Sequence, residues 1–115
     1  MTQVVKLAQL AGHELAPGVR MRPLFGVGAM LNLLEFEPDA SVPEHEHPHE
    51  QLGLVLEGEL TLRIGGVDNV LRAGDGYQID GGVPHAASTG ASRCRVLDVF
   101  QPVREDYRAA VQDSP

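Results

Sequence analysis

Short apolar runs separated by turn-forming residues dominate this chain. Residues 19–25 and 30–36 are two such runs across a Gly-Val-Gly turn, and residues 60–64 alternate between apolar and polar side chains. Successive side chains of a strand point to opposite faces, so this period of two predicts β-structure. Further short strands are predicted at residues 52–56, 70–71, 77–79 and 85–89.

The last predicted strand, residues 93–100, carries an acid in an apolar row. Cys94, Val96, Asp98 and Phe100 share one face of it. Beyond Pro102, residues 104–111 begin with acidic side chains and continue with good helix formers, which predicts a short C-terminal helix.

Turns and the N-terminal segment complete the pattern. Gly-rich residues 65–69 are predicted to form a turn, as are residues 73–76. The apolar residues 4–10 are interpreted as an edge strand or a swapped arm, and His13 as a surface side chain in a turn.

Composition supports one all-β domain over residues 1–115. The chain is 43% hydrophobic, and its 13 Gly and 8 Pro are spread along it, as is typical of a β-sandwich or barrel. A net charge of -7 without a Lys/Arg run argues against nucleic acid and membrane as partners. A single cysteine, Cys94, and no signal-peptide pattern favour a cytoplasmic protein.

Three histidines lie close together at residues 45–49. His45 and His47 are two apart, so on an extended segment their imidazoles face one space, as two ligands of one metal must. Pro43 and Pro48 stiffen this segment. The alternative is a solvated loop in which the histidines have no joint role.

The spacing of these residues resembles the two cupin motifs. Residues 39–58 are similar to Gly-x5-His-x-His-x3/4-Glu-x6-Gly, and residues 74–89 to Gly-x5-Pro-x-Gly-x2-His-x3-Asn. The departures are Asp39, Gln51, Asp80 and Thr89. The resemblance implies a jelly-roll cupin β-barrel whose metal ligands are His45, His47, Gln51 and His85.

The metal implied is a divalent transition ion, Ni, Zn, Mn, Fe or Co. Gln51 stands where the motif has a carboxylate, which leaves more of the ion's charge uncompensated and argues against iron-dependent oxygenation. His49 is interpreted as a residue that lines or supports the site, and Glu50 as exposed.

A second group of residues follows in the chain. If the Asp98 face points inward, its carboxyl lies in an apolar cavity and could act as a general acid or base. Phe100 would form part of the pocket wall, and Arg104 could hold a carboxylate through two hydrogen bonds. The alternatives are that Asp98 only hydrogen bonds to backbone amides, that Phe100 only packs in the core, and that Arg104 forms a surface salt bridge.

Residues 98–107 and 45–51 resemble the pectin-degradation cupins of the KdgF family. The resemblance implies catalytic roles for Asp98 and Arg104, substrate binding by Phe100 and Arg104, and a small-molecule substrate. Such proteins convert ring-closed 4,5-unsaturated uronates into linear keto acids. Alternatives are a cupin dioxygenase or other isomerase of a small organic acid, and a non-catalytic sugar- or metabolite-binding cupin.

The outward faces of two predicted strands are apolar. Leu52, Leu54 and Leu56 would point away from Gln51, and Leu97 and Val99 away from Asp98. Such rows need a cover, so we expect a homodimer.

Overall fold

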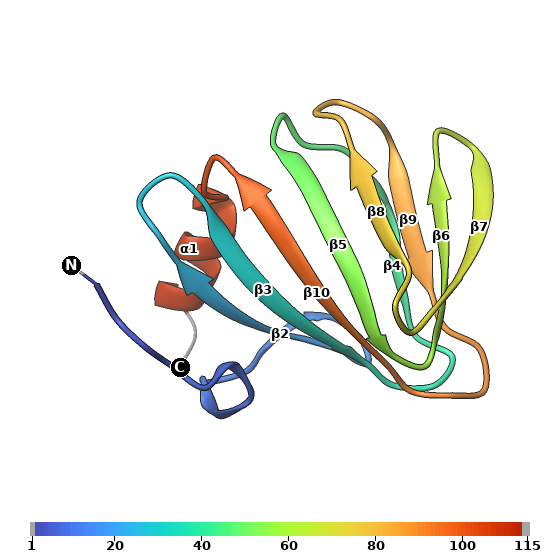
Figure 1. Ribbon diagram of the computed structural model, residues 1–115, viewed down its shortest axis with the longest axis horizontal. Helices are drawn as coiled ribbons and strands as arrows, with labels where there is room; N and C mark the ends of the chain where they lie inside the picture. The colour runs from blue at the N-terminus through green and yellow to red at the C-terminus, as the bar shows by residue number, and fades with distance from the viewer. Residues whose placement is uncertain (1, 114–115) are drawn as a thin grey trace.

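The computed structural model describes residues 2–113 as two antiparallel sheets that face each other with one helix at the C-terminal end (Figure 1). The sheet orders are β1-β2-β3-β10-β5-β8 and β4-β9-β6-β7. The elements are η1 (Leu7–Gln9), β1 (His13–Ala16), β2 (Val19–Phe25), β3 (Met30–Phe36), β4 (Ser41–His45), β5 (Glu50–Glu57), β6 (Glu59–Ile64), β7 (Val67–Arg72), β8 (Gly76–Ile79), β9 (His85–Ser88), β10 (Cys94–Gln101) and α1 (Glu105–Asp113). The prediction of an all-β jelly roll with a short C-terminal helix is confirmed.

The centre of the larger sheet is β10, which pairs with β3 on one side and β5 on the other. Its side chains alternate between buried and half-buried, and Cys94, Val96, Asp98 and Phe100 face inward. The predicted orientation of this strand is therefore confirmed, and it brings the carboxyl of Asp98 into the interior.

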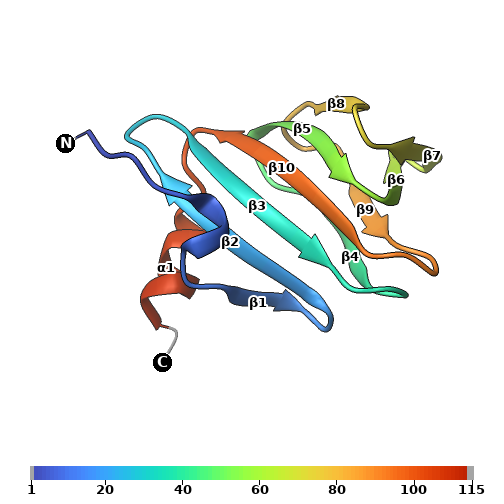
Figure 2. The ribbon, with the colours of Figure 1, turned by 60° about the horizontal axis from the view of Figure 1, so that its bottom comes forward.

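The core forms where the two sheets face each other. Its side chains include Met21, Leu34 and Val55 from the larger sheet and Leu60 and Leu62 from the smaller one. α1 lies beside the β2 end of the larger sheet, as Figure 2 shows from a second direction. It is anchored by buried Tyr107 and by the guanidinium of Arg108, 4.8 Å from the ring centroid of Phe25.

The interpretation of residues 4–10 as an edge strand is wrong, whereas a swapped arm, which would need a second chain, stays a prediction. They form no strand; a single 3-10 turn, Leu7–Gln9, lies near β2, and Arg22 donates a hydrogen bond to the Leu10 carbonyl. The reason is that β1 already occupies the edge of β2. His13, interpreted as a turn residue, begins this unforeseen strand.

The turn predicted at residues 65–69 is shorter than expected. Only Gly65 and Gly66 connect β6 to β7, and Ile64 pairs directly with Val67. Both glycines have positive φ angles, 55° and 82°, as a two-residue type I′ hairpin requires. Residues 67–69 therefore belong to β7.

None of the helices within residues 2–113 is long and apolar enough to cross a membrane.

Candidate functional site

Three histidines converge between the two sheets. His45 ends β4 and His85 begins β9, and the two are register partners, while His47 lies in the loop that leads to β5. Their candidate ligand atoms all lie within 4.8 Å of one another. The ring of His49 packs 5.5 Å from that of His47 but does not join this group.

Backbone carbonyls orient all three imidazoles in the same way. Each Nδ1 lies within hydrogen-bond distance of a carbonyl oxygen, which only accepts, so each Nδ1 carries the proton and each Nε2 keeps a free lone pair. The carbonyls belong to Pro43, His49 and Val83, at 2.8, 3.1 and 2.9 Å from His45, His47 and His85.

Two observations show that a metal ion fits these residues. The Nε2 atom of His85 is buried and has no hydrogen-bond partner among the described residues. The Nε2 atom of His47 lies 3.1 Å from Oε1 of Gln51, so two acceptors face each other. The Gln51 amide also hydrogen bonds to Asp98, which directs its oxygen toward the histidines. A cation bound by both acceptors would remove their repulsion.

The electrostatics keep the imidazoles neutral. Burial, aided by the charge of Arg104, lowers the pKa of His47 to about 4. Burial also lowers the pKa of His85. Because a metal binds the neutral imidazole, both side chains are ready to bind at neutral pH without losing a proton.

Asp98 is held beside this cluster. Its side chain is 2% exposed, and the hydroxyl of Tyr77 donates a 2.5 Å hydrogen bond to it. Burial raises the pKa of Asp98 to about 6, although the hydrogen bonds from Tyr77 and Gln51 act in the opposite direction. A carboxyl group with this pKa can hold or release a proton near neutral pH.

Tyr77 is a site residue that the sequence reasoning missed. Its ring lies over Gly53, its register partner, where an added Cβ would be 2.0 Å from Cζ of the ring. A glycine inside a strand often marks such a close approach, so Gly53 was the available signal.

Arg104 precedes α1 and is buried under two aromatic rings. Its guanidinium carbon lies 3.8 Å from the ring centroid of Tyr107 and 5.1 Å from that of Phe100. Its Nε and Nη2 donate to the Asp106 carboxylate at 3.2 and 2.7 Å, and its Nη1 donates to the Tyr107 hydroxyl at 2.9 Å. Asp106 and Tyr107, which the sequence reasoning did not single out, therefore fix its position.

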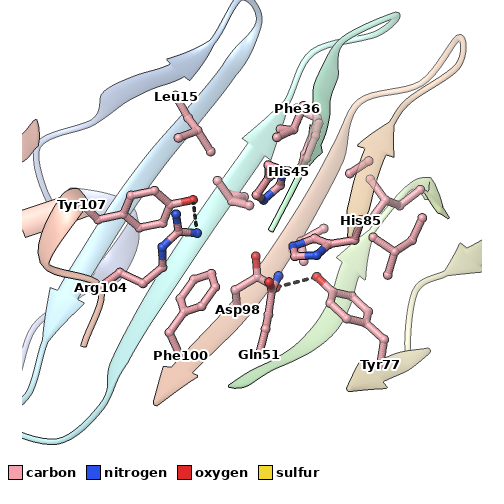
Figure 3. Close-up of a pocket in the computed structure, with 16 residues that line it drawn as sticks. Leu15, Phe36, His45, Gln51, Tyr77, His85, Asp98, Phe100, Arg104 and Tyr107 are labelled. Carbon is pink, nitrogen blue, oxygen red and sulfur yellow. Dashed lines mark hydrogen bonds between the residues drawn. The ribbon is translucent and has the colours of Figure 1, made fainter. Parts of the chain in front are cut away.

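These groups share one small cavity (Figure 3). Its volume is about 30 Å³, enough for about two water molecules. A larger ligand would therefore have to displace side chains at its boundary. Its polar and aromatic lining comprises Phe36, His45, Gln51, Tyr77, His85, Asp98, Phe100, Arg104 and Tyr107.

Comparison with known proteins identifies related sequences. A family model of the cupin domain matches residues 32–100. The HTH-type transcriptional regulators PuuR of Escherichia coli (strain K12) and Shigella flexneri are each 41% identical over 69 residues, 58% of this chain and 37% of the regulator. The chain thus spans little more than a third of the length of these curated relatives.

Two solved structures share the whole architecture. An RmlC-like cupin from Shewanella frigidimarina has a TM-score of 0.86 at 29% identity, covering 93% of this chain and 96% of that one. KdgF from Halomonas sp. also has a TM-score of 0.86, at 22% identity, covering 93% and 99%. At that identity the likeness to KdgF concerns the fold.

Proposed function

The chain belongs to the cupin domain family, and we propose that it is a metal-dependent cupin enzyme acting on a small carboxylated sugar. The observation that carries the proposal is that Asp98, Arg104 and two members of the histidine cluster, His45 and His85, line one cavity. A proton carrier, a carboxylate-binding cation and a candidate metal centre are together what such a reaction needs.

His45, His47, Gln51 and His85 would hold the ion, a divalent transition metal such as Ni, Zn, Mn, Fe or Co. When bound, it would act as a Lewis acid toward oxygen atoms of the substrate.

Arg104 would bind the substrate carboxylate. Asp106 occupies the Nε and Nη2 edge of the guanidinium, and Nη1 donates to Tyr107. Since a guanidinium has five N–H groups, donors remain on both terminal nitrogens. Phe100, whose ring lies under the Arg104 guanidinium and meets the His47 ring edge to face, would form the wall beside the sugar ring.

The substrate class that best suits these groups is the 4,5-unsaturated uronates. In ring opening, the C1 hydroxyl loses a proton, the bond from C1 to the ring oxygen breaks, and that oxygen becomes a protonated enol oxygen. The enol then loses its oxygen-bound proton and gains one at C4, which leaves a ketone at C5. Substrate and product are isomers, so Asp98 would only have to move protons between these atoms.

The test is turnover of unsaturated galacturonate by metal-loaded protein, followed by loss of the conjugated enol-acid absorbance. Asp98→Asn should lower kcat by about 100-fold or more, because general acid–base catalysis is lost. Arg104→Lys should raise KM by about tenfold, because one forked hydrogen bond is lost. The matched control is Asp68→Asn, an exposed carboxylate paired with Arg63. Absence of turnover with every unsaturated uronate would refute the proposal, and oxygen consumption would favour a dioxygenase.

A second candidate is a non-catalytic domain that binds a sugar or another metabolite. It is favoured by the 41% identity to PuuR, a transcriptional regulator. In this case Arg104 and the metal would anchor the ligand. Calorimetry would then detect binding of the sugar acid by the wild-type protein, and no turnover would accompany it.

A further inference from the structure

Asn32 is a buried polar side chain in the middle of β3. Its exposed fraction is 0%, and neither its Nδ2 nor its Oδ1 has a hydrogen-bond partner among the described residues. It faces the barrel interior, on the same face as Leu34 and Phe36. Those two residues line the cavity and Asn32 does not, so a ligand would have to displace a lining side chain to reach it. The proposed mechanism gives this residue no role.

The register shows which side chains surround Asn32. Asp98 is its direct partner on β10, and Pro23 is its partner on β2. The remaining neighbours on the inner face are Met21, Phe25, Met30, Leu34, Val96 and Phe100. Asp98 is therefore the one polar group next to Asn32 on this face of the described sheet.

A buried amide in apolar surroundings is unfavourable. Leaving its donor and its acceptor unpaired destabilises the folded chain, whereas an apolar side chain of similar shape would be neutral or stabilising. An unpaired amide at such a position therefore points to a partner that binds from outside the chain.

The order of side chains across the sheet shows where this partner would lie. The register row runs Asn32, Asp98, Gly53, Tyr77, and the Tyr77 ring reaches over Gly53 to hydrogen bond Asp98 from one side. Asn32 flanks Asp98 on the other side. Directly opposed side chains on one face have Cβ atoms about 5 Å apart, so one oxygen atom between them can reach both.

We propose that Asn32 binds a hydroxyl group of the carboxylated sugar next to Asp98. This inference rests on the proposed function and adds a specificity-determining residue to it. A hydroxyl both donates and accepts, so it can pair with Oδ1 or Nδ2, whereas a carboxylate could pair only with Nδ2. The ligand class is therefore a sugar acid that keeps a free ring hydroxyl beside the reacting atoms.

The experiment compares wild type with Asn32→Leu, using unsaturated galacturonate and its deoxy analogues. Asn32→Leu should raise KM by about tenfold, the effect of one lost hydrogen bond, without lowering the thermal midpoint. For wild type, the KM of one deoxy analogue should exceed that of the full substrate by a similar factor. For the variant, the KM values of this analogue and of the full substrate should be equal. Should Asn32→Leu not fold, Asn32→Thr, smaller and still polar, replaces it in the same analogue comparison.

The outcomes separate the two claims. If wild type turns over the substrate but the variant keeps its KM and responds to every deoxy analogue as wild type does, this inference is overturned and the proposed function stands. A water molecule bonded to Asn32 in crystals both with and without sugar acid would also overturn it. If wild type turns over no unsaturated uronate, the proposed function fails and this inference fails with it.

Discussion

The hydroxyl of Tyr77 reaches Oδ1 of Asp98 across the inner face of the larger sheet, at 2.5 Å. The two residues lie on strands that do not pair, because β5 runs between β8 and β10. Gly53 of β5 leaves the space that the tyrosine ring occupies, since an added Cβ would meet its Cζ at 2.0 Å. The position of the carboxyl thus depends on a missing side chain.

Gly53→Ala should therefore displace the ring and remove the hydrogen bond. We expect kcat to fall by about tenfold or more as Asp98 loses its fixed position. The unfolding midpoint should also fall, because an overpacked interior costs about 1–3 kcal/mol. Steady-state kinetics and thermal melting measure the two effects. Gly28→Ala is the control, since a Cβ at Gly28 meets nothing within 4 Å; equal effects of both substitutions would contradict the explanation.

A divalent metal should stabilise the protein through the histidine cluster. At a free concentration 100 times its dissociation constant, a ligand that binds only the folded state adds about 2.7 kcal/mol to the free energy of unfolding. We expect His85→Ala to abolish this gain, measured by urea unfolding of chelator-treated protein with and without Ni, Zn or Mn. His13→Ala, half-buried at the start of β1, should retain it. A gain that persists in His85→Ala would place the metal elsewhere.

The metal-free protein should show two opposing effects of acid. Burial lowers the pKa of His47 from 6.5 to about 4. Between pH 6.5 and pH 4 this imidazole is therefore protonated in the unfolded chain but neutral in the folded chain, so the free energy of unfolding falls as the pH falls toward 4. Burial raises the pKa of Asp98 from 3.8 to about 6. The protonated carboxyl therefore stabilises the folded chain fully below pH 3.8, and this stabilisation is lost as the pH rises through 6. Acidification therefore lowers the free energy of unfolding through His47 and raises it through Asp98.

Asp98→Asn removes the pH effect of the Asp98 carboxyl and should reveal the effect of His47. Between pH 6.5 and pH 4 we expect its free energy of unfolding to fall more steeply than that of wild type, by on the order of 2–3 kcal/mol. Urea unfolding in the presence of a chelator measures both curves. Parallel curves for the two proteins would show that the carboxyl of Asp98 titrates normally in the fold.

The outer face of the larger sheet should bind a second copy of the chain. Leu52, Leu54 and Leu56 are 47%, 39% and 40% exposed, and the first two pair in register with Val99 and Leu97. An apolar patch continuous over neighbouring strands favours a dimer. We expect a dimer in sedimentation at micromolar concentration and a monomer for Leu54→Glu. Val70→Glu, on β7 of the other sheet, is the control; a wild-type monomer would refute the interface.

The sequence predicted what depends on local order along the chain. The bounds of β2 and β3 followed from two apolar runs on either side of a glycine turn, and the inward face of β10 from a period of two. The meeting of His45 with His47 followed from their spacing. Each of these relations involves residues within one strand or one loop, which is why a pattern along the chain reveals them.

Relations between distant strands were not predictable in this way. Tyr77 meets Asp98 because two separate pairings, β8 with β5 and β5 with β10, bring them into one row. The side chain of Asn32 has no hydrogen-bond partner among the described residues, and this too depends on side chains from several strands.

The candidate ligands are divided between the two sheets, with His45 and His85 on the smaller and Gln51 on the larger. His45, His47 and Gln51 are close in sequence, so a chain that is still folding could already offer these three to an ion. His85 joins only when β9 has paired with β4. All four ligands would therefore be together only after the two sheets have closed the barrel. An ion bound earlier by the first three would favour the pairing of β9 with β4, because this pairing adds the imidazole of His85.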